Sequence, residues 1–259
     1  MVTVVVGGVL VILLVALIAV GGLALVQHFV PLEIRESHSA AIGITYGALS
    51  IMFGVIVGFT AYLVLNKYTT SQNTAQSEAG DVVEIYRLAD QLAPEQRDQI
   101  QELATSYAQV VVDEEWPLMQ QGQTSPHAGA LAQKLRKSIQ GIEPSTSVEQ
   151  ALYSHMLERA HDLDQHREVR LLNAREGLPP VLWIVLMLLG GITILFTYFL
   201  GMESAWLHSL AVAALAVGIT LIMVTIFALD SPFGTDVRVG PEAFKLALQT
   251  MEGNGEQQT

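Results

Sequence analysis

The stretch that decides the fold runs from Ala40 to Leu92 and reads AAIGITYGALSIMFGVIVGFTAYLVLNKYTTSQNTAQSEAGDVVEIYRLADQL. Its first part, up to Leu65, holds no charged residue, and ~26 residues at a rise of ~1.5 Å are long enough to cross a ~30 Å hydrocarbon core. Its second part carries apolar or small residues at alternating spacings of four and three, which is typical of a helix in a bundle. These residues are Ala75, Ala79, Val82, Tyr86 and Ala89. Because neither Pro nor a turn signal separates the two parts, the sequence predicts one long helix, half in lipid and half in water.

Small residues recur every three or four positions in the apolar part and leave one helix face almost bare of side chains. They are Gly43, Gly47, Ser50, Gly54, Gly58 and Ala61. Such a face either packs closely against another backbone, which is its commoner meaning, or lines a pore. One chain with four spans could hardly enclose a conduit, so a pore would need a symmetric ring of subunits.

Three further stretches, residues 2–30, 181–200 and 209–229, are long and apolar enough to be spans. The first is far longer than the apolar region of a signal peptide and lacks a basic segment before it, so we expect it to be retained. The chain of 259 residues is 51% hydrophobic and only 15% charged, which is typical of an integral membrane protein. Since the predicted spans hold no Asp, Glu, Lys or Arg, a proton relay or charge-coupled transporter is disfavoured.

The predicted fold is an all-α membrane protein in which a cytosolic helical bundle is inserted between spans two and three. Residues 1–65 hold spans one and two, 66–178 the helical domain, 179–229 spans three and four, and 230–259 a tail with a short amphipathic helix. Of the 13 Lys and Arg, only Arg35 lies in a loop on the other side of the membrane. The positive-inside rule therefore predicts a multi-pass protein of the cell membrane, with the domain and both termini in the cytoplasm. The net charge of −12 disfavours nucleic-acid binding.

Two arginines of the last domain helix are expected to be buried. Continuing its apolar stripe past Leu163 by four and three residues includes Arg167 and Arg170, and buried guanidinium groups need carboxylate partners. Glu78 and Asp81 on the central helix lie at a similar distance from the membrane, so antiparallel packing would bring the four residues together. We predict a clamp in which Glu78 pairs with Arg167 or Arg170. It is either a static ion pair or part of a gating or ligand site.

The remaining motifs indicate structure rather than chemistry. Glu158 and His161 have the Glu-x-x-His spacing that di-iron bundles use in duplicate, but a second copy is absent, so a solvated helix face is favoured over a metal site. The segment 114–117, Glu-Glu-Trp-Pro, predicts a kink with a buried indole. No phosphate loop, nucleophile elbow or pair of catalytic carboxylates is found, so we expect no catalytic residue, no cofactor and no enzyme activity. The turn Pro232-Phe233-Gly234 predicts a helix stop before a helix that docks on the bundle.

Taken together, these features resemble the bestrophin-like membrane proteins of bacteria and plants. The matching pieces are Glu78-Ala79, Tyr86-Arg87, Glu115-Trp116-Pro117, Arg167 with Arg170, Leu178-Pro179 with Trp183, and Pro232-Phe233-Gly234. The chain is more distantly similar to the bestrophins, which are pentameric anion channels with a cytosolic helical vestibule and a narrow apolar neck on the second span.

The resemblance implies a homo-oligomer, a pentamer by analogy, that meets the lipid bilayer and inorganic ions. The implied neck or pore-facing residues are Ser50, Ile51, Met52, Phe53, Gly54, Val57, Gly58 and Thr60. Bestrophins follow Pro-Phe-Gly with a run of acidic calcium ligands, whereas only Asp236 follows closely here, which argues against calcium activation. The leading hypothesis is an ion channel, selective for anions by analogy or for cations because of its acidic charge. The alternative is a non-conducting scaffold or sensor that recruits a cytosolic partner.

Overall fold

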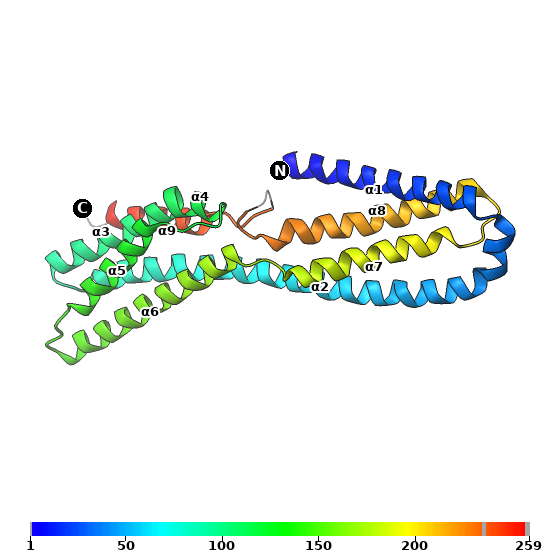
Figure 1. Cartoon of the computed structure of the whole chain (residues 1–259). Helices are drawn as coiled ribbons and strands as arrows, with labels where there is room; N and C mark the ends of the chain where they lie inside the picture. Colours follow the sequence, from blue (N-terminus) through cyan, green and yellow to red (C-terminus); the bar gives the residue numbers. More distant parts are fainter. Residues whose placement is uncertain (1, 235–236, 257–259) are drawn as a thin grey trace. The chain divides into compact units, whose positions relative to one another are not determined.

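The structure is a computed structural model that describes residues 2–234 and 237–256, and helices dominate the described part (Figure 1). The elements are α1 (Val2–Phe29), α2 (Leu32–Ala89), α3 (Pro94–Val110), the π-helical turn η1 (Val111–Glu115), α4 (Trp116–Met119), α5 (Pro126–Gln140), α6 (Ser147–Arg175), α7 (Pro180–Tyr198), α8 (Ala205–Asp230) and α9 (Glu242–Glu256). The described residues contain no strand, which confirms the all-α class. Asp236 lies outside the described residues.

Four helices, α1, α2, α7 and α8, are long and apolar enough to cross a membrane, as predicted. The chain divides into two compact units. Unit 1 comprises Met1–Asn66 and Gly177–Asp230, and unit 2 comprises Lys67–Glu176 and Ser231–Thr259. The C-terminal segment, for which the sequence predicts a tail whose short helix docks on the bundle, belongs to unit 2. Its helix α9 buries Phe244, Leu248 and Met251 in the core of that unit.

The second helix begins earlier than the sequence predicts. The sequence predicts a loop with Arg35, a short polar link between spans one and two, but α1 ends at Phe29 and α2 starts at Leu32. Pro31 precedes the helix directly, where its missing N–H costs nothing, and Glu33 in the first turn interacts favourably with the helix dipole. The polar residues of the expected link are thus the first turns of a 58-residue helix.

Unit 1 packs its four helices through two apolar clusters. The first joins α1 to α7 and α8 and consists of Ala19, Leu23, Tyr198, Val212 and Ala216. The second joins α2 to the same two helices and consists of Phe53, Val57, Val64, Leu186 and Ile226. Close approach is visible at Gly190, where a Cβ atom would lie 3.3 Å from Ile219 and 3.4 Å from Phe53. Just before α7 begins, the backbone N–H of Leu178 donates to the carboxylate of Asp230, the last residue of α8, over 2.7 Å.

Unit 2 is a bundle of the second part of α2 with α3, η1, α4, α5, α6 and α9 around one core. Helix α6 starts at a capping box, in which the Thr146 hydroxyl accepts from the N–H of Glu149 and the Glu149 carboxylate accepts from that of Thr146. Helix α5 starts with Ser125 as its N-cap. These caps determine where α5 and α6 begin, and therefore which residues each helix turns toward the core.

Candidate functional site

The centre of unit 2 is the guanidinium group of Arg170, which α6 carries into the core. The side chains of Arg170 and Glu78 are both fully buried. The Arg170 Nε donates to Glu78 Oε2 over 2.5 Å, and its Nη2 donates to Glu78 Oε1 over 2.9 Å. This two-bond geometry is the strongest arrangement available to an arginine and a carboxylate. Of the two partners that the sequence left open for Glu78, the structure places Arg170 against it.

A second buried carboxylate, Glu115, joins both arginines. Its Oε2 accepts from Arg170 Nη2 over 2.7 Å, and its Oε1 accepts from Arg167 Nη2 over 2.5 Å. Glu115 ends the π-helical turn η1, which inserts one extra residue and so changes which side chains face the core. Two carboxylates therefore meet two guanidinium groups, and the buried network is electrically balanced.

Neutral and aromatic groups complete the shell of this network. The Tyr107 hydroxyl donates to Glu78 Oε1 over 2.5 Å, and the Arg170 guanidinium lies 5.2 Å from the Trp116 ring centroid. Burial and the neighbouring Glu78 charge raise the pKa of Tyr107 well above its usual value, so this phenol stays protonated. Burial alone would lower the pKa of Arg170, but the charge and hydrogen bonds of Glu78 outweigh it and raise the pKa. Arg170 is therefore always cationic.

Asp81 does not join the network, although the sequence grouped it with the two arginines. Its carboxylate lies 2.6 Å from Nδ1 of His166 and 3.3 Å from Nη1 of Arg159. Three residues along α2 amount to about 300° of rotation, which turns Asp81 toward a different part of α6. Burial raises the pKa of Asp81, while the hydrogen bond and charge of His166 oppose this rise. Asp81 thus forms a second and separate polar cluster.

The predicted neck residues do not share one face of α2. Phe53, Val57 and Thr60 are buried in unit 1, where the first two pack against α7 and α8. Buried side chains are not available to a pore, so this part of the prediction is corrected. Ile51, Met52, Gly54 and Gly58 are exposed, and Ser50 is half-buried.

The large exposed side chains of α2 define a different set. Ile51, Val55 and Phe59 are 70%, 66% and 61% exposed and follow one another at intervals of four residues. At about 100° of rotation per residue, these three lie on the side of α2 opposite the buried Phe53 and Val57. No described residue of the chain covers this face. We call Ile51, Val55 and Phe59 the open face of α2.

The turn after α8 belongs to the core of unit 2. Phe233 is buried against Trp116, with ring centroids 5.7 Å apart. The N–H of Val239 donates to the carbonyl of Pro232 over 2.7 Å, and the Trp116 indole N–H donates to the carbonyl of Val239 over 3.2 Å. The buried indole that the sequence predicted thus packs on the turn Pro232-Phe233-Gly234.

The other motifs supply no metal site. Glu158 and His161 are exposed, and Glu158 lies 3.7 Å from Arg159. Among residues 2–234 and 237–256, no group of three or more His, Asp or Glu side chains is arranged to hold a metal ion.

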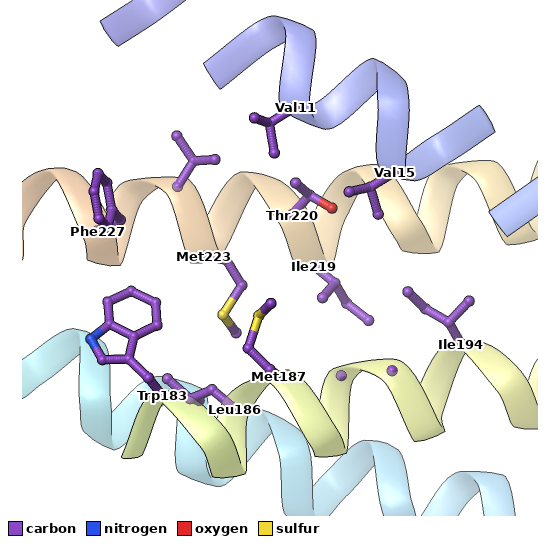
Figure 2. A pocket seen from close by; sticks show the side chains of 13 residues that line it. Val11, Val15, Trp183, Leu186, Met187, Ile194, Ile219, Thr220, Met223 and Phe227 are labelled. Atoms are coloured by element: carbon purple, nitrogen blue, oxygen red, sulfur yellow. The ribbon is translucent and has the colours of Figure 1, made fainter. Parts of the chain in front are cut away.

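Unit 1 contains an apolar cavity of about 420 Å³ between α1, α7 and α8. Figure 2 shows Val11 and Val15 of α1, Trp183 and Met187 of α7, and Met223 of α8 around it. The hydroxyl of Thr220, another lining residue, donates to the carbonyl of Ala216 within its own helix. The cavity therefore offers little to an ion.

Comparison with known proteins identifies the class. The chain belongs to the family defined by the Bestrophin-like domain, whose model matches residues 13–244. No curated protein matches the sequence significantly.

Solved structures share the fold at low sequence identity. A variant of a bacterial bestrophin homologue from Klebsiella pneumoniae matches with a TM-score of 0.72 and 12% identity, over 95% of this chain and 99% of that one. A second crystal structure of a bestrophin homologue from Klebsiella pneumoniae matches with a TM-score of 0.68 and 11% identity, over 96% and 97% of the two chains. The protein thus has the fold of bestrophins across nearly its whole length.

Glu115 is the residue of the network that sequence reasoning missed as a charge partner. The prediction grouped the two buried guanidinium groups of α6 with Glu78 and Asp81, so its charges were already balanced. In the structure Asp81 contacts His166 and Arg159 instead, and Glu115 is the second carboxylate of the network. The sequence signal for Glu115 was its position beside the predicted buried indole.

Proposed function

We propose that this protein is an ion channel in which a ring of identical subunits surrounds a pore lined by α2. The observation that carries the proposal is the open face of α2, where Ile51, Val55 and Phe59 remain uncovered on a helix whose opposite side is buried. A ring of subunits would bring these side chains together around one axis and form an apolar constriction, a known type of channel gate. Membership of the Bestrophin-like family and the fold of bestrophins support this arrangement.

The same proposal assigns the orientation and the number of subunits. Unit 2 holds 12 of the 13 Lys and Arg, so by the positive-inside rule it lies in the cytoplasm together with both termini. Five subunits follow by analogy with the bestrophins.

Two features favour different ions. The bestrophin fold favours anions by analogy. Unit 2, however, carries 21 Asp and Glu against 12 Lys and Arg, a net charge of −9, which raises the local concentration of cations. The measurement of selectivity is therefore part of the test.

The buried network has a role in gating in this proposal. Helix α2 continues from the span into unit 2, and four residues separate the end of α6 from the start of α7. The Glu78–Arg170 pair and the bond from Lys67 Nζ to the carbonyl of Glu176 tie these two helices together. A movement of either helix in unit 2 is thereby passed to the other.

Purified protein in a planar bilayer under a potassium chloride gradient tests the proposal. We expect stable unitary currents, with a reversal potential near that of chloride for an anion channel or near that of potassium for a cation channel. Ile51→Ala should raise the unitary current because it widens the constriction. Leu17→Ala, which truncates an exposed side chain on α1, is the matched control and should leave the current unchanged.

Reproducible silence, with insertion of the protein demonstrated, would overturn the channel proposal. The non-conducting scaffold or sensor would then be the better description. Its unit 2 would be tested for recruitment of a cytosolic partner.

A further inference from the structure

Arg35 is the only Lys or Arg in unit 1, and no described residue pairs with its charge. The side chain is only 6% exposed, and its Nε and Nη1 are buried without a hydrogen-bond acceptor among the described residues. A buried charged donor without an acceptor is strongly unfavourable, because it has lost its hydration and gained nothing in exchange. The burial of these donors indicates that a group from outside the chain accepts the hydrogen bonds of the Arg35 guanidinium.

The loop between α7 and α8 packs directly onto the helix turn that carries Arg35. A Cβ atom on Gly201 would lie 2.8 Å from the Cα and 2.9 Å from the N of Glu36, so only glycine allows this approach. The carboxylates nearest in sequence, Glu33 and Glu36, are exposed, and neither accepts a hydrogen bond from the Nε or Nη1 of Arg35. The guanidinium is therefore enclosed without being neutralised.

A second buried polar atom at this end of unit 1 also lacks a partner. His208 in the first turn of α8 is buried, with Nε2 2.8 Å from the carbonyl oxygen of Thr197. Its Nδ1 has no hydrogen-bond partner among the described residues. Figure 1 shows that the α1–α2 connection and the α7–α8 loop lie at the same end of the helices. Unsatisfied polar groups thus occur on two different helices of this end.

The position of Arg35 along α2 corresponds to the lipid headgroups. The apolar stretch begins at Ala40, five residues later, which is ~7.5 Å along the helix. The headgroup layer is ~5–7 Å thick on each side of the hydrocarbon core. Trp206 at the start of α8 is 69% exposed, as is typical of aromatic residues at the membrane interface.

We propose that Arg35 binds a phosphate group, supplied either by a phospholipid headgroup or by inorganic phosphate. The planar guanidinium presents fixed N–H donors that match phosphate oxygens, and one negative charge would balance the only Lys or Arg of unit 1. The site is distinct from the buried network and from the open face of α2, and it does not depend on whether the protein conducts ions.

The test is thermal unfolding of the full chain, delipidated in detergent and phosphate-free buffer. Three probes are added separately: sodium phosphate, dioleoylphosphatidylglycerol, and dioleoylglycerol, which lacks the phosphate. Arg35→Gln removes the charge, and Arg87→Gln, at an exposed position of α2, is the matched control. We expect a phosphate-bearing probe to raise the Tm of wild type and of Arg87→Gln. Its affinity for Arg35→Gln should be at least about tenfold weaker than its affinity for wild type. Dioleoylglycerol should have no effect.

The probes also separate the two sources of phosphate. A rise with phosphatidylglycerol but not with sodium phosphate assigns a lipid headgroup, and an equal rise with both assigns free phosphate. Equal shifts in wild type and Arg35→Gln would overturn the proposal. The proposal would also be overturned if neither phosphate-bearing probe raised the Tm of wild type, and this result does not depend on any variant. In that case, a smaller oligomer for Arg35→Gln would identify the partner as a carboxylate of a second copy.

Discussion

Arg170 of α6 and Glu78 of α2 are joined by two hydrogen bonds of 2.5 and 2.9 Å, and both side chains are fully buried. The two residues are 92 positions apart in the chain. Neither charge reaches water, so each is tolerated in the core only because the other, together with Glu115, is present. The pair therefore determines how α2 packs on α6 within unit 2.

Replacing Glu78 by Gln should destabilise the protein by ~3–5 kcal/mol, because it leaves Arg170 with one carboxylate fewer in a dry core. The measurement is thermal or denaturant unfolding of the full chain in detergent. Glu168→Gln, at an exposed position of α6, is the control and should change the free energy of unfolding by less than ~0.5 kcal/mol. An unchanged Tm for Glu78→Gln would show that the pair is not buried.

Replacing both partners should cost less than the sum of the two single changes. In Glu78→Met with Arg170→Met, Glu115 still pairs with Arg167, so the remaining network stays balanced. A double-mutant cycle should give an interaction energy of ~0.5–3 kcal/mol for residues in contact. Strictly additive changes would mean that the two side chains do not interact.

Substitutions of the two neighbouring glutamates of the π-helical turn should differ in their cost to stability. Glu115→Gln leaves two guanidinium groups with one carboxylate and should cost ~3–5 kcal/mol. Glu114 is 46% exposed and pairs with His127, so Glu114→Gln should cost less than ~1 kcal/mol. The two free energies of unfolding provide the comparison. Equal costs would contradict the inward orientation of Glu115.

The helices and the burial of Arg170 were predictable because bundle helices in water alternate apolar and polar faces. The spacing of Met156, Ala160 and Leu163 leads directly to Arg170, and all four are buried. Asp81 was assigned wrongly because the prediction compared only how far each residue lies from the membrane along its helix. It ignored that Asp81, three residues after Glu78, points in a different direction from α2. Glu115 was missed as a partner because a π-helical turn changes the phase of a helix without an unambiguous sequence signal.

The sequence did not allow us to predict which side of the membrane part of α2 packs inside unit 1 and which side is exposed. Phe53 and Phe59 are both apolar and six residues apart, yet one packs inside unit 1 and the other is exposed. In lipid, a helix is apolar all round, so the pattern of hydrophobicity does not tell which side meets protein. The packing of α7 and α8 decides this, and it depends on contacts between distant parts of the chain.

Asp81 should give the protein a measurable pH dependence. Burial raises the pKa of Asp81 above 3.8, so the folded protein binds this proton more tightly than the unfolded chain does. Its contribution to stability is therefore present at low pH and lost as the pH rises through the raised pKa. The Tm of wild type minus that of Asp81→Asn should therefore fall as the pH rises from below 3.8 through the raised pKa of Asp81. A difference that rises with pH would show that His166 and Arg159 outweigh burial.

Under the proposed channel function, substitutions of Phe53 and Phe59 should separate effects on stability from effects on conduction. Phe53→Ala empties a buried position between α2 and α7 and should cost ~3–5 kcal/mol, with the unitary current of the folded protein unchanged. Phe59→Ala truncates a side chain of the open face, so it should change stability by less than ~0.5 kcal/mol and raise the unitary current. Unfolding and planar-bilayer recordings on the same preparations give both values. A current that responds to Phe53→Ala and not to Phe59→Ala would place the opposite side of α2 at the pore.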